Sequence, residues 1–132
     1  MILIFGGSYQ GKLKYAIERF GLTEEDIYRC DTENTETPGN KRLIYEIDKW
    51  ILALIKDDAD VNGAVRLMID EHENSIIVCN DISCGVVPED PIYRKWREAV
   101  GKAMAELVET ADEVVRLFCG IPCVLKRNGE LK

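Results

Sequence analysis

The sequence predicts an α/β sandwich, in which helices cover both faces of a mostly parallel β-sheet. Two observations support this fold class. Short apolar runs alternate along the chain with segments of helical periodicity, and the runs at 2–5 and 76–79 are continuously apolar. Alternating strands and helices are typical of parallel sheets, and continuous apolar strands are typical of sheets covered on both faces. A length of 132 residues fits a single domain that spans residues 1–132.

The first predicted strand leads into a glycine-rich loop, and this loop opens a helix. The helix is predicted over 12–20 and ends at Gly21, a residue type that favours the position after a helix. The loop and the first helical residues read Gly6-Gly7-Ser8-Tyr9-Gln10-Gly11-Lys12-Leu13. A buried strand, a glycine turn and a helix start together form the context of a phosphate-binding loop.

This loop predicts a nucleotide site. Glycines let several backbone N–H groups point at one anion, and the helix N-terminus adds a partial positive charge. We expect all eight residues to contact nucleotide, and Lys12 to reach the outer phosphates as a catalytic residue. The pattern G-x-x-x-x-G-K-[ST] fails only at Leu13, where a hydroxyl would bind Mg²⁺. The sequence thus predicts a P-loop-type three-layer sandwich that holds ATP or GTP and binds Mg²⁺ weakly. A glycine turn without a ligand is the alternative.

The remaining elements continue the alternation. A second strand is predicted over 27–31, and the polar tract 32–40 after it is expected to be a flexible surface loop. Three further helices are predicted at 41–56, 60–71 and 90–110. Three further strands are predicted at 75–80, 114–119 and 123–126, the last two as a C-terminal hairpin. One alternative stays open, because Leu43–Tyr45 could instead be the end of a strand.

Two carboxylates follow predicted strands, at the sheet edge where the phosphate loop also lies. Asp31 follows the second strand and Asp81 follows the strand at 75–80. Ligands of parallel sheets bind at the carboxyl ends of strands. We therefore expect Asp31 and Asp81 as metal ligands, and Asp81 also as a catalytic group that polarises an acceptor hydroxyl. Both residues could instead be ordinary turn residues.

Charge and cysteine content narrow the class of partner. The chain has 17 Lys and Arg against 24 Asp and Glu, a net charge of −7, which argues against nucleic acid or an anionic membrane as its partner. No apolar run is long enough to span a membrane, and the N-terminus does not resemble a signal peptide. Five cysteines without a C-x-x-C pair predict reduced thiols in a cytoplasmic protein.

Motifs in the second half of the chain point to one family. The loop after the strand at 75–80 reads Asn80-Asp81-Ile82-Ser83-Cys84-Gly85-Val86-Val87-Pro88-Glu89. The next helix and strand contribute Arg94, Trp96, Arg97, Glu98, Gly101, Ala111-Asp112-Glu113-Val114 and Gly120. Together with the N-terminal glycine loop, and in the same order, these residues resemble the adenosylcobinamide kinase / adenosylcobinamide-phosphate guanylyltransferase family of cobalamin biosynthesis.

The resemblance implies a nucleotide, a corrinoid alcohol as phosphoryl acceptor, and a trimeric assembly. It also implies a second reaction, in which GMP is transferred through a histidine. The departures from the family are Leu13, Met104-Ala105 in place of Asn-Gln, and the short tract 32–40 in place of a helix with the reactive histidine. His72, at the end of a predicted helix, is expected on the surface, so the guanylyl transfer is expected to be lost. Glu46 is a weaker candidate for the family's second carboxylate.

Two hypotheses of different class follow. The protein is either a shortened cobinamide kinase, or a catalytically inactive relative that binds nucleotide or phosphate as a binding or regulatory module. Arg94 and Arg97 lie on one predicted helix and could clamp phosphate. A solvated helix face or a subunit contact is the alternative for both arginines.

Overall fold

The computed structural model describes residues 1–82 and 89–132. Within these residues the chain forms seven strands, four α-helices and one 3₁₀ turn. The strands are β1 (Ile2–Gly6), β2 (Ile27–Arg29), β3 (Leu43–Tyr45), β4 (Ile76–Asn80), β5 (Glu113–Phe118), β6 (Ile121–Arg127) and β7 (Glu130–Leu131). The helices are α1 (Lys12–Phe20), α2 (Ile47–Lys56), α3 (Val61–Glu71) and α4 (Pro91–Thr110), and the 3₁₀ turn η1 covers Glu24–Asp26.

All seven strands form one sheet in the order β2-β3-β4-β1-β5-β6-β7. The first five strands in this order run parallel, whereas β6 and β7 are antiparallel additions. The fold is therefore the predicted α/β sandwich with a mostly parallel sheet and a C-terminal hairpin. The register pairs Gly6 with Asn80, so the chain leaves β1 and β4 at the same level of the sheet edge.

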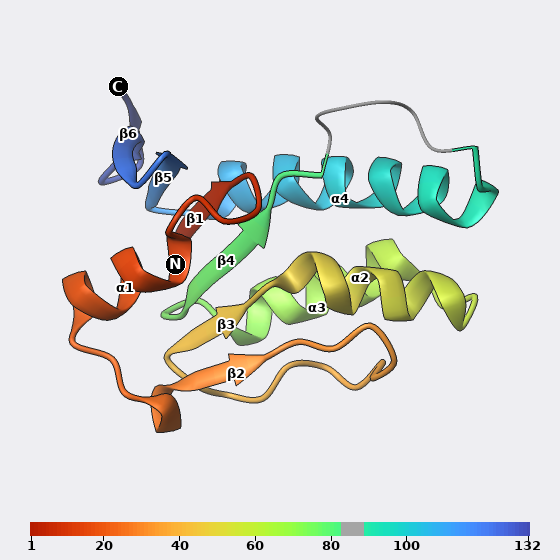
Figure 1. The fold of residues 1–132 in the computed structure, drawn as a ribbon. Coiled ribbons are helices and arrows are strands. Elements are labelled where there is room, and N and C mark those ends of the chain that lie inside the picture. The colour runs from red at the N-terminus through yellow and green to blue at the C-terminus, as the bar shows by residue number, and fades with distance from the viewer. Residues whose placement is uncertain (83–88) are drawn as a thin grey trace.

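Helices cover the two faces unequally. Figure 1 shows α1 on one side of the strands and α2, α3 and α4 on the other. Alternate residues of the central strands face the two sides, because side chains of a strand point to opposite faces. Leu3 and Ile77 pack with the three helices, whereas Ile4 and Val78 pack with α1.

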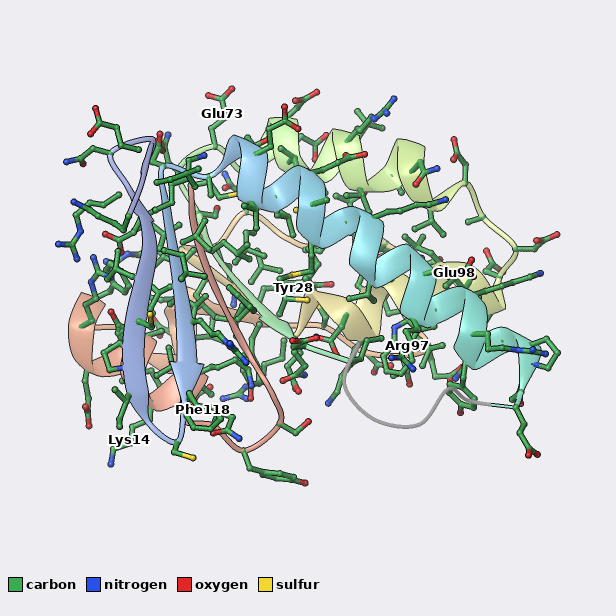
Figure 2. All side chains as sticks on the ribbon, turned by 90° about the horizontal axis from the view of Figure 1, so that it is seen from above. Lys14, Tyr28, Glu73, Arg97, Glu98 and Phe118 are labelled. Atoms are coloured by element: carbon green, nitrogen blue, oxygen red, sulfur yellow. The ribbon has the colours of Figure 1, made fainter. Side chains whose placement is uncertain are left out.

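In Figure 2 α4 contacts β5 and β6 at its C-terminal end, where Lys126 donates to the carbonyl oxygens of Val108 and Glu109, and diverges from them toward the end that carries Phe118. Phe118, at the end of β5, is 61 % exposed there. The pairing partner of Phe118 is Ile121, which is also exposed. The hydrophobic core lies over β3, β4, β1 and the buried residues of β5, Val114, Val115 and Leu117, and leaves the β5–β6 turn exposed.

The predicted helix over 41–56 is wrong in its first turn. Leu43–Tyr45 forms the short parallel strand β3, and the helix begins only at Ile47. Leu43 and Ile44 are fully buried on opposite faces of the sheet. A short apolar run that is buried on both faces cannot be distinguished by periodicity from the start of a buried helix.

The tract 32–40 makes more contacts with the rest of the protein than its polar composition suggests. Pro38 is buried, the carbonyl oxygen of Thr35 accepts a hydrogen bond from Trp50 Nε1 at 3.3 Å, and Gly39 packs against the Tyr28 ring. The prediction of a surface histidine is wrong. His72 is 3 % exposed, and its Nδ1 and Nε2 lie 2.8 Å and 3.2 Å from the carbonyl oxygens of Met68 and Gly39.

The C-terminal hairpin is longer than predicted. β6 begins at Ile121 instead of residue 123, and the additional strand β7 follows a turn at Asn128-Gly129. Both turn residues have positive φ, which Asn-Gly readily adopts. The dipeptide was thus a readable hairpin signal. Among the described residues, no helix is long and apolar enough to cross a membrane.

Candidate functional site

The glycine loop is shaped by close contact with the neighbouring strand. A Cβ atom added to Gly6 would lie 2.5 Å from the carbonyl oxygen of Leu117, so only glycine fits where the loop leaves β1. Gly11 precedes α1 with φ 83°, a left-handed conformation that glycine adopts without strain. Tyr9 also has positive φ, at 61°, and its side chain is fully exposed.

The loop is tied on its outer side to the turn between β5 and β6. The N–H of Gly120 donates to the carbonyl oxygen of Gln10 at 3.1 Å, and the N–H of Cys119 donates to Gln10 Oε1. These bonds connect the glycine loop to a segment more than 100 positions away in the sequence. Figure 2 places Lys14 and Phe118 at this same end of the sheet.

Lys12 points back into the loop. Its Nζ donates to the carbonyl oxygen of Gly7 at 2.6 Å, and the residue is 4 % exposed. Burial lowers the pKa of Lys12, whereas the nearby carboxylates of Asp48 and Glu46 raise it. The lysine therefore lies between the glycine loop on one side and an acidic pair on the other.

The acidic pair comes from the junction of β3 and α2. Glu46 is the only residue between the two elements, and it adopts φ 59° and ψ 57°. A non-glycine residue in this left-handed region is strained, and such strain is concentrated at functional sites. Its carboxylate is half-buried and held on both oxygens, by Lys49 Nζ at 2.9 Å and by Asn80 Nδ2 at 2.9 Å.

Asp48 follows two residues later, as the second residue of α2, and is buried. It accepts hydrogen bonds from the backbone N–H of Asn80 at 2.9 Å and from Asn80 Nδ2 at 3.1 Å. Its backbone carbonyl oxygen accepts from Trp96 Nε1 at 2.7 Å, so α4 also contacts this point. Burial raises the pKa of the Asp48 carboxyl, and the two hydrogen bonds from Asn80 oppose that rise.

A cavity of about 630 Å³ opens between the glycine loop and this junction. Its lining includes five residues of the predicted loop: Ser8, Tyr9, Gly11, Lys12 and Leu13. The opposite wall is made by Tyr45, Glu46, Asp48, Lys49, Asn80 and Trp96. Lysines and carboxylates therefore line the same space, which suits a ligand that carries phosphate groups and a divalent cation.

The other predicted residues do not appear in the described lining of this cavity. Asp31 is exposed and accepts a hydrogen bond from the N–H of Glu33 at 2.7 Å. The N–H of Asp81 donates to the carbonyl oxygen of Gly6 at 2.8 Å. Arg94 is exposed, and Arg97 is half-buried on the side of α4 that Figure 2 shows near α2.

Asp31 and Asp81 as metal ligands, and the two arginines as a phosphate clamp, therefore stay predictions. The motif after β4 extends past the residues that the structure describes. Its residues 83–88, with Cys84 among them, lie outside the described residues. Four of the five cysteines are described and all four are free, two of them buried (Cys30 and Cys79) and two exposed (Cys119 and Cys123).

Sequence reasoning missed Asp48 and gave too little weight to Glu46. Both lie within the helix predicted over 41–56, where charged residues are expected on the outward, solvated face. The signal that could have found them is the sequence Leu43-Ile44-Tyr45-Glu46, an apolar run that ends in a carboxylate, which is a strand-end pattern.

The fold and the cavity define a P-loop-type sandwich, with a glycine loop and a lysine at the carboxyl edge of its sheet. The chain belongs to the cobinamide kinase / cobinamide phosphate guanyltransferase family, whose model matches residues 34–125, more than half of the chain. This family is a nucleotide-binding family of cobalamin biosynthesis. The glycine loop lies before the matched range, whereas Glu46, Asp48, Asn80 and Trp96 lie within it. A search of curated proteins found no significant match.

Proposed function

We propose that the cavity binds the polyphosphate of ATP or GTP and that the protein transfers the terminal phosphoryl group to a corrinoid hydroxyl. The observation that carries this proposal is the position of Lys12, buried between the glycine loop and the Glu46–Asp48 pair. A lysine at this place can stabilise the negative charge of the transferred phosphoryl group. Catalysis of phosphoryl transfer depends mainly on such positioning and electrostatic stabilisation.

In the reaction, the acceptor oxygen forms a bond to the terminal phosphorus while the bond to the diphosphate leaving group breaks. The proton of the acceptor hydroxyl passes to a carboxylate, for which Glu46 and Asp81 are the candidates. Glu46 is supported by its place in the cavity lining, with Lys49 and Asn80 holding its two oxygens. Asp81 is supported by its place directly after β4, against the start of the glycine loop.

The residues present fit Mg²⁺ only with help from the nucleotide. Leu13 brings no hydroxyl to the cavity, and the described residues contain no cluster of three or more acidic, histidine or cysteine side chains able to hold a metal. Magnesium usually binds proteins through one or two carboxylates and completes its shell with water and phosphate oxygens. Glu46 is the carboxylate in the best position for Mg²⁺, which would neutralise charge on the phosphates there, and Asp81 would then be the proton acceptor.

His72 supports the loss of the guanylyl-transfer step. It is the one histidine of the sequence. Both of its ring nitrogens face backbone carbonyl oxygens in a buried setting, and the residue is not among those that line the cavity.

We retain a homo-oligomeric assembly and a cytoplasmic location as predictions.

Isothermal titration with ATP and GTP, with and without Mg²⁺, tests the proposal. We expect binding that strengthens with Mg²⁺ and a loss of about tenfold or more in affinity for Lys12→Ala, because charged hydrogen bonds to phosphate are strong. The matched control is Lys102→Ala, which removes an exposed lysine of α4. Failure of both nucleotides to bind at millimolar concentration would refute the proposal.

The second candidate function is binding without catalysis, favoured by Leu13 and by the engagement of Lys12 with Gly7 inside its own loop. The variant Leu13→Ser separates the two functions. A large gain in Mg²⁺-dependent binding would mean that the natural site has given up its metal. Little change, together with phosphate transfer to cobinamide, would support the kinase.

A further inference from the structure

Asp48 is a buried carboxylate to which the proposed reaction gives no task. It lies on the first turn of α2 and is 2 % exposed. A carboxylate is rarely buried to this extent unless a specific partner compensates its charge. Its partner is an amide instead of a cation, because the described structure shows no ion pair to its carboxylate. A cost of this kind calls for a role that an apolar side chain could not fulfil.

The hydrogen bonds of Asp48 fix one residue twice. Its Oδ1 accepts the backbone N–H of Asn80 and its Oδ2 accepts the side-chain amide of the same residue. An ionised carboxylate only accepts hydrogen bonds, so it forces Asn80 to present its NH₂ group instead of its carbonyl oxygen. Asp48 thereby determines which way the Asn80 amide is turned.

The orientation of Asn80 determines the orientation of Glu46. The same Nδ2 that donates to Asp48 also donates to Glu46 Oε2 at 2.9 Å. The amide group has two N–H bonds, and each of them points at one carboxylate. If the amide turned over, its carbonyl oxygen would face Glu46, and the contact would become repulsive.

We propose that Asp48 is a positioning residue, which acts through Asn80 to hold the Glu46 carboxylate beside Lys12. The inference rests on the proposed nucleotide site and assigns Asp48 a task in it. A metal in the cavity would meet Glu46 and not Asp48, because Asp48 is 2 % exposed whereas Glu46 is half-buried. Trp96 fixes the backbone of Asp48 from α4, so three elements converge to orient one carboxylate of the cavity.

The decisive variant is Asp48→Asn. The new side chain can still accept the N–H of Asn80, but its NH₂ group meets the NH₂ group of Asn80, so that amide turns away and releases Glu46. We expect the Mg²⁺-dependent gain in GTP affinity to fall about tenfold, since hydrogen bonds to charged groups are the strong ones. Affinity without Mg²⁺ should stay within about twofold of the natural protein.

Two further variants make the titration specific. Asp57→Asn removes an exposed aspartate at the other end of the same helix and should leave binding unchanged. Glu46→Gln should lose the same Mg²⁺-dependent gain, and adding Asp48→Asn to it should cost nothing more, because both changes remove one function. Additive losses in the double variant, or equal losses with and without Mg²⁺, would overturn the proposal in favour of a purely structural Asp48.

A ligand-free measurement separates this inference from the nucleotide proposal. The side-chain amide protons of Asn80 should exchange slowly with solvent by NMR in the natural protein and in Asp57→Asn, and fast in Asp48→Asn. If neither nucleotide binds and this pattern holds, the proposed function fails while the positioning by Asp48 stands. If Asn80 exchanges equally in all three proteins, the positioning fails whatever the binding data show.

Discussion

Two strand-to-helix connections line the cavity, and they differ in length and in the groups that they present. The connection from β1 to α1 takes five residues, 7–11, and the connection from β3 to α2 takes one, Glu46. Each contains a non-glycine residue in the left-handed region, Tyr9 at φ 61° and Glu46 at φ 59°. Both residues line the cavity, but the Tyr9 side chain is fully exposed, whereas the Glu46 side chain is half-buried and bonded to Lys49 and Asn80.

The difference shows how the two connections divide the chemistry. The long connection presents glycine backbone and the N-terminus of α1, which suit an anion. The tight connection presents carboxylates, which suit a cation or a proton. Lys12 lies between them and contacts the first through Gly7. A phosphate ligand with its metal needs both kinds of surface, so the site depends on the two connections staying in register.

The largest expected effect comes from changing the last residue of β1, Gly6, from which the long connection starts. Gly6→Ala would bring a methyl group to 2.5 Å from the backbone carbonyl oxygen of Leu117, which cannot move without separating β1 from β5. We expect a loss of about 3 kcal/mol in the free energy of unfolding, as for severe overpacking. Urea unfolding followed by circular dichroism measures it.

The control for that variant is Gly101→Ala. Gly101 is exposed in the interior of α4, and a Cβ there would have no neighbour within 4 Å. Because alanine favours helix more than glycine does, this variant should gain about 1 kcal/mol. Equal stability of the two variants would mean that the β1–β5 contact at Gly6 is loose.

An intermediate effect separates the two left-handed residues directly. Glycine at either position relieves backbone strain, but at Glu46 it also removes the bonds to Lys49 and Asn80. We expect Glu46→Gly to lose about 1 kcal/mol of unfolding free energy. Tyr9→Gly should instead gain about 0.5 kcal/mol, since its side chain lies in solvent and only strain and chain entropy change.

The comparison would fail if both glycine variants changed stability in the same direction. Thermal unfolding at one pH and salt concentration is sufficient for this test, because each variant is compared with the natural protein. A gain in Glu46→Gly would mean that the strain at residue 46 outweighs its hydrogen bonds.

The smallest effect is a contrast in pH dependence between two buried carboxylates. Burial raises the pKa of Asp48 above its usual 3.8, whereas the hydrogen bond from Arg19 lowers the pKa of Glu113 below its usual 4.5. As pH falls through the folded pKa of Asp48 toward 3.8, the natural protein should gain stability relative to Asp48→Asn, because the native state takes up the proton more readily.

Glu113 should behave in the opposite way. Its pairing stabilises the fold above pH 4.5, and this contribution is lost as pH falls through its lower folded pKa. The advantage of the natural protein over Glu113→Gln should therefore shrink on acidification. Unfolding free energies of both variants at several pH values check the two signs, and parallel curves would contradict the contrast.

The sequence by itself determined the features that are local in the chain. The position of the glycine loop, the helix that it opens and the helix start at Asp90-Pro91 can all be predicted from neighbouring residues, and the structure has α1 and α4 within a residue of the expected bounds. The motifs after β4 also identified the family, which the match over residues 34–125 confirms. These features can be predicted because turn geometry and helix capping need no distant partner.

The tertiary structure alone decided which polar residues share the cavity. The three residues of β3 are too few for hydrophobic periodicity to distinguish a strand from a helix. Their pairing with β2 and β4 decides that Leu43–Tyr45 is a strand. That pairing turns Glu46 and Asp48 from an outward helix face into the wall opposite Lys12. Burial of His72 and Asp48 likewise comes from distant carbonyl and amide partners, at Gly39 and Asn80, and such satisfaction of buried polar groups is a property of the assembled fold.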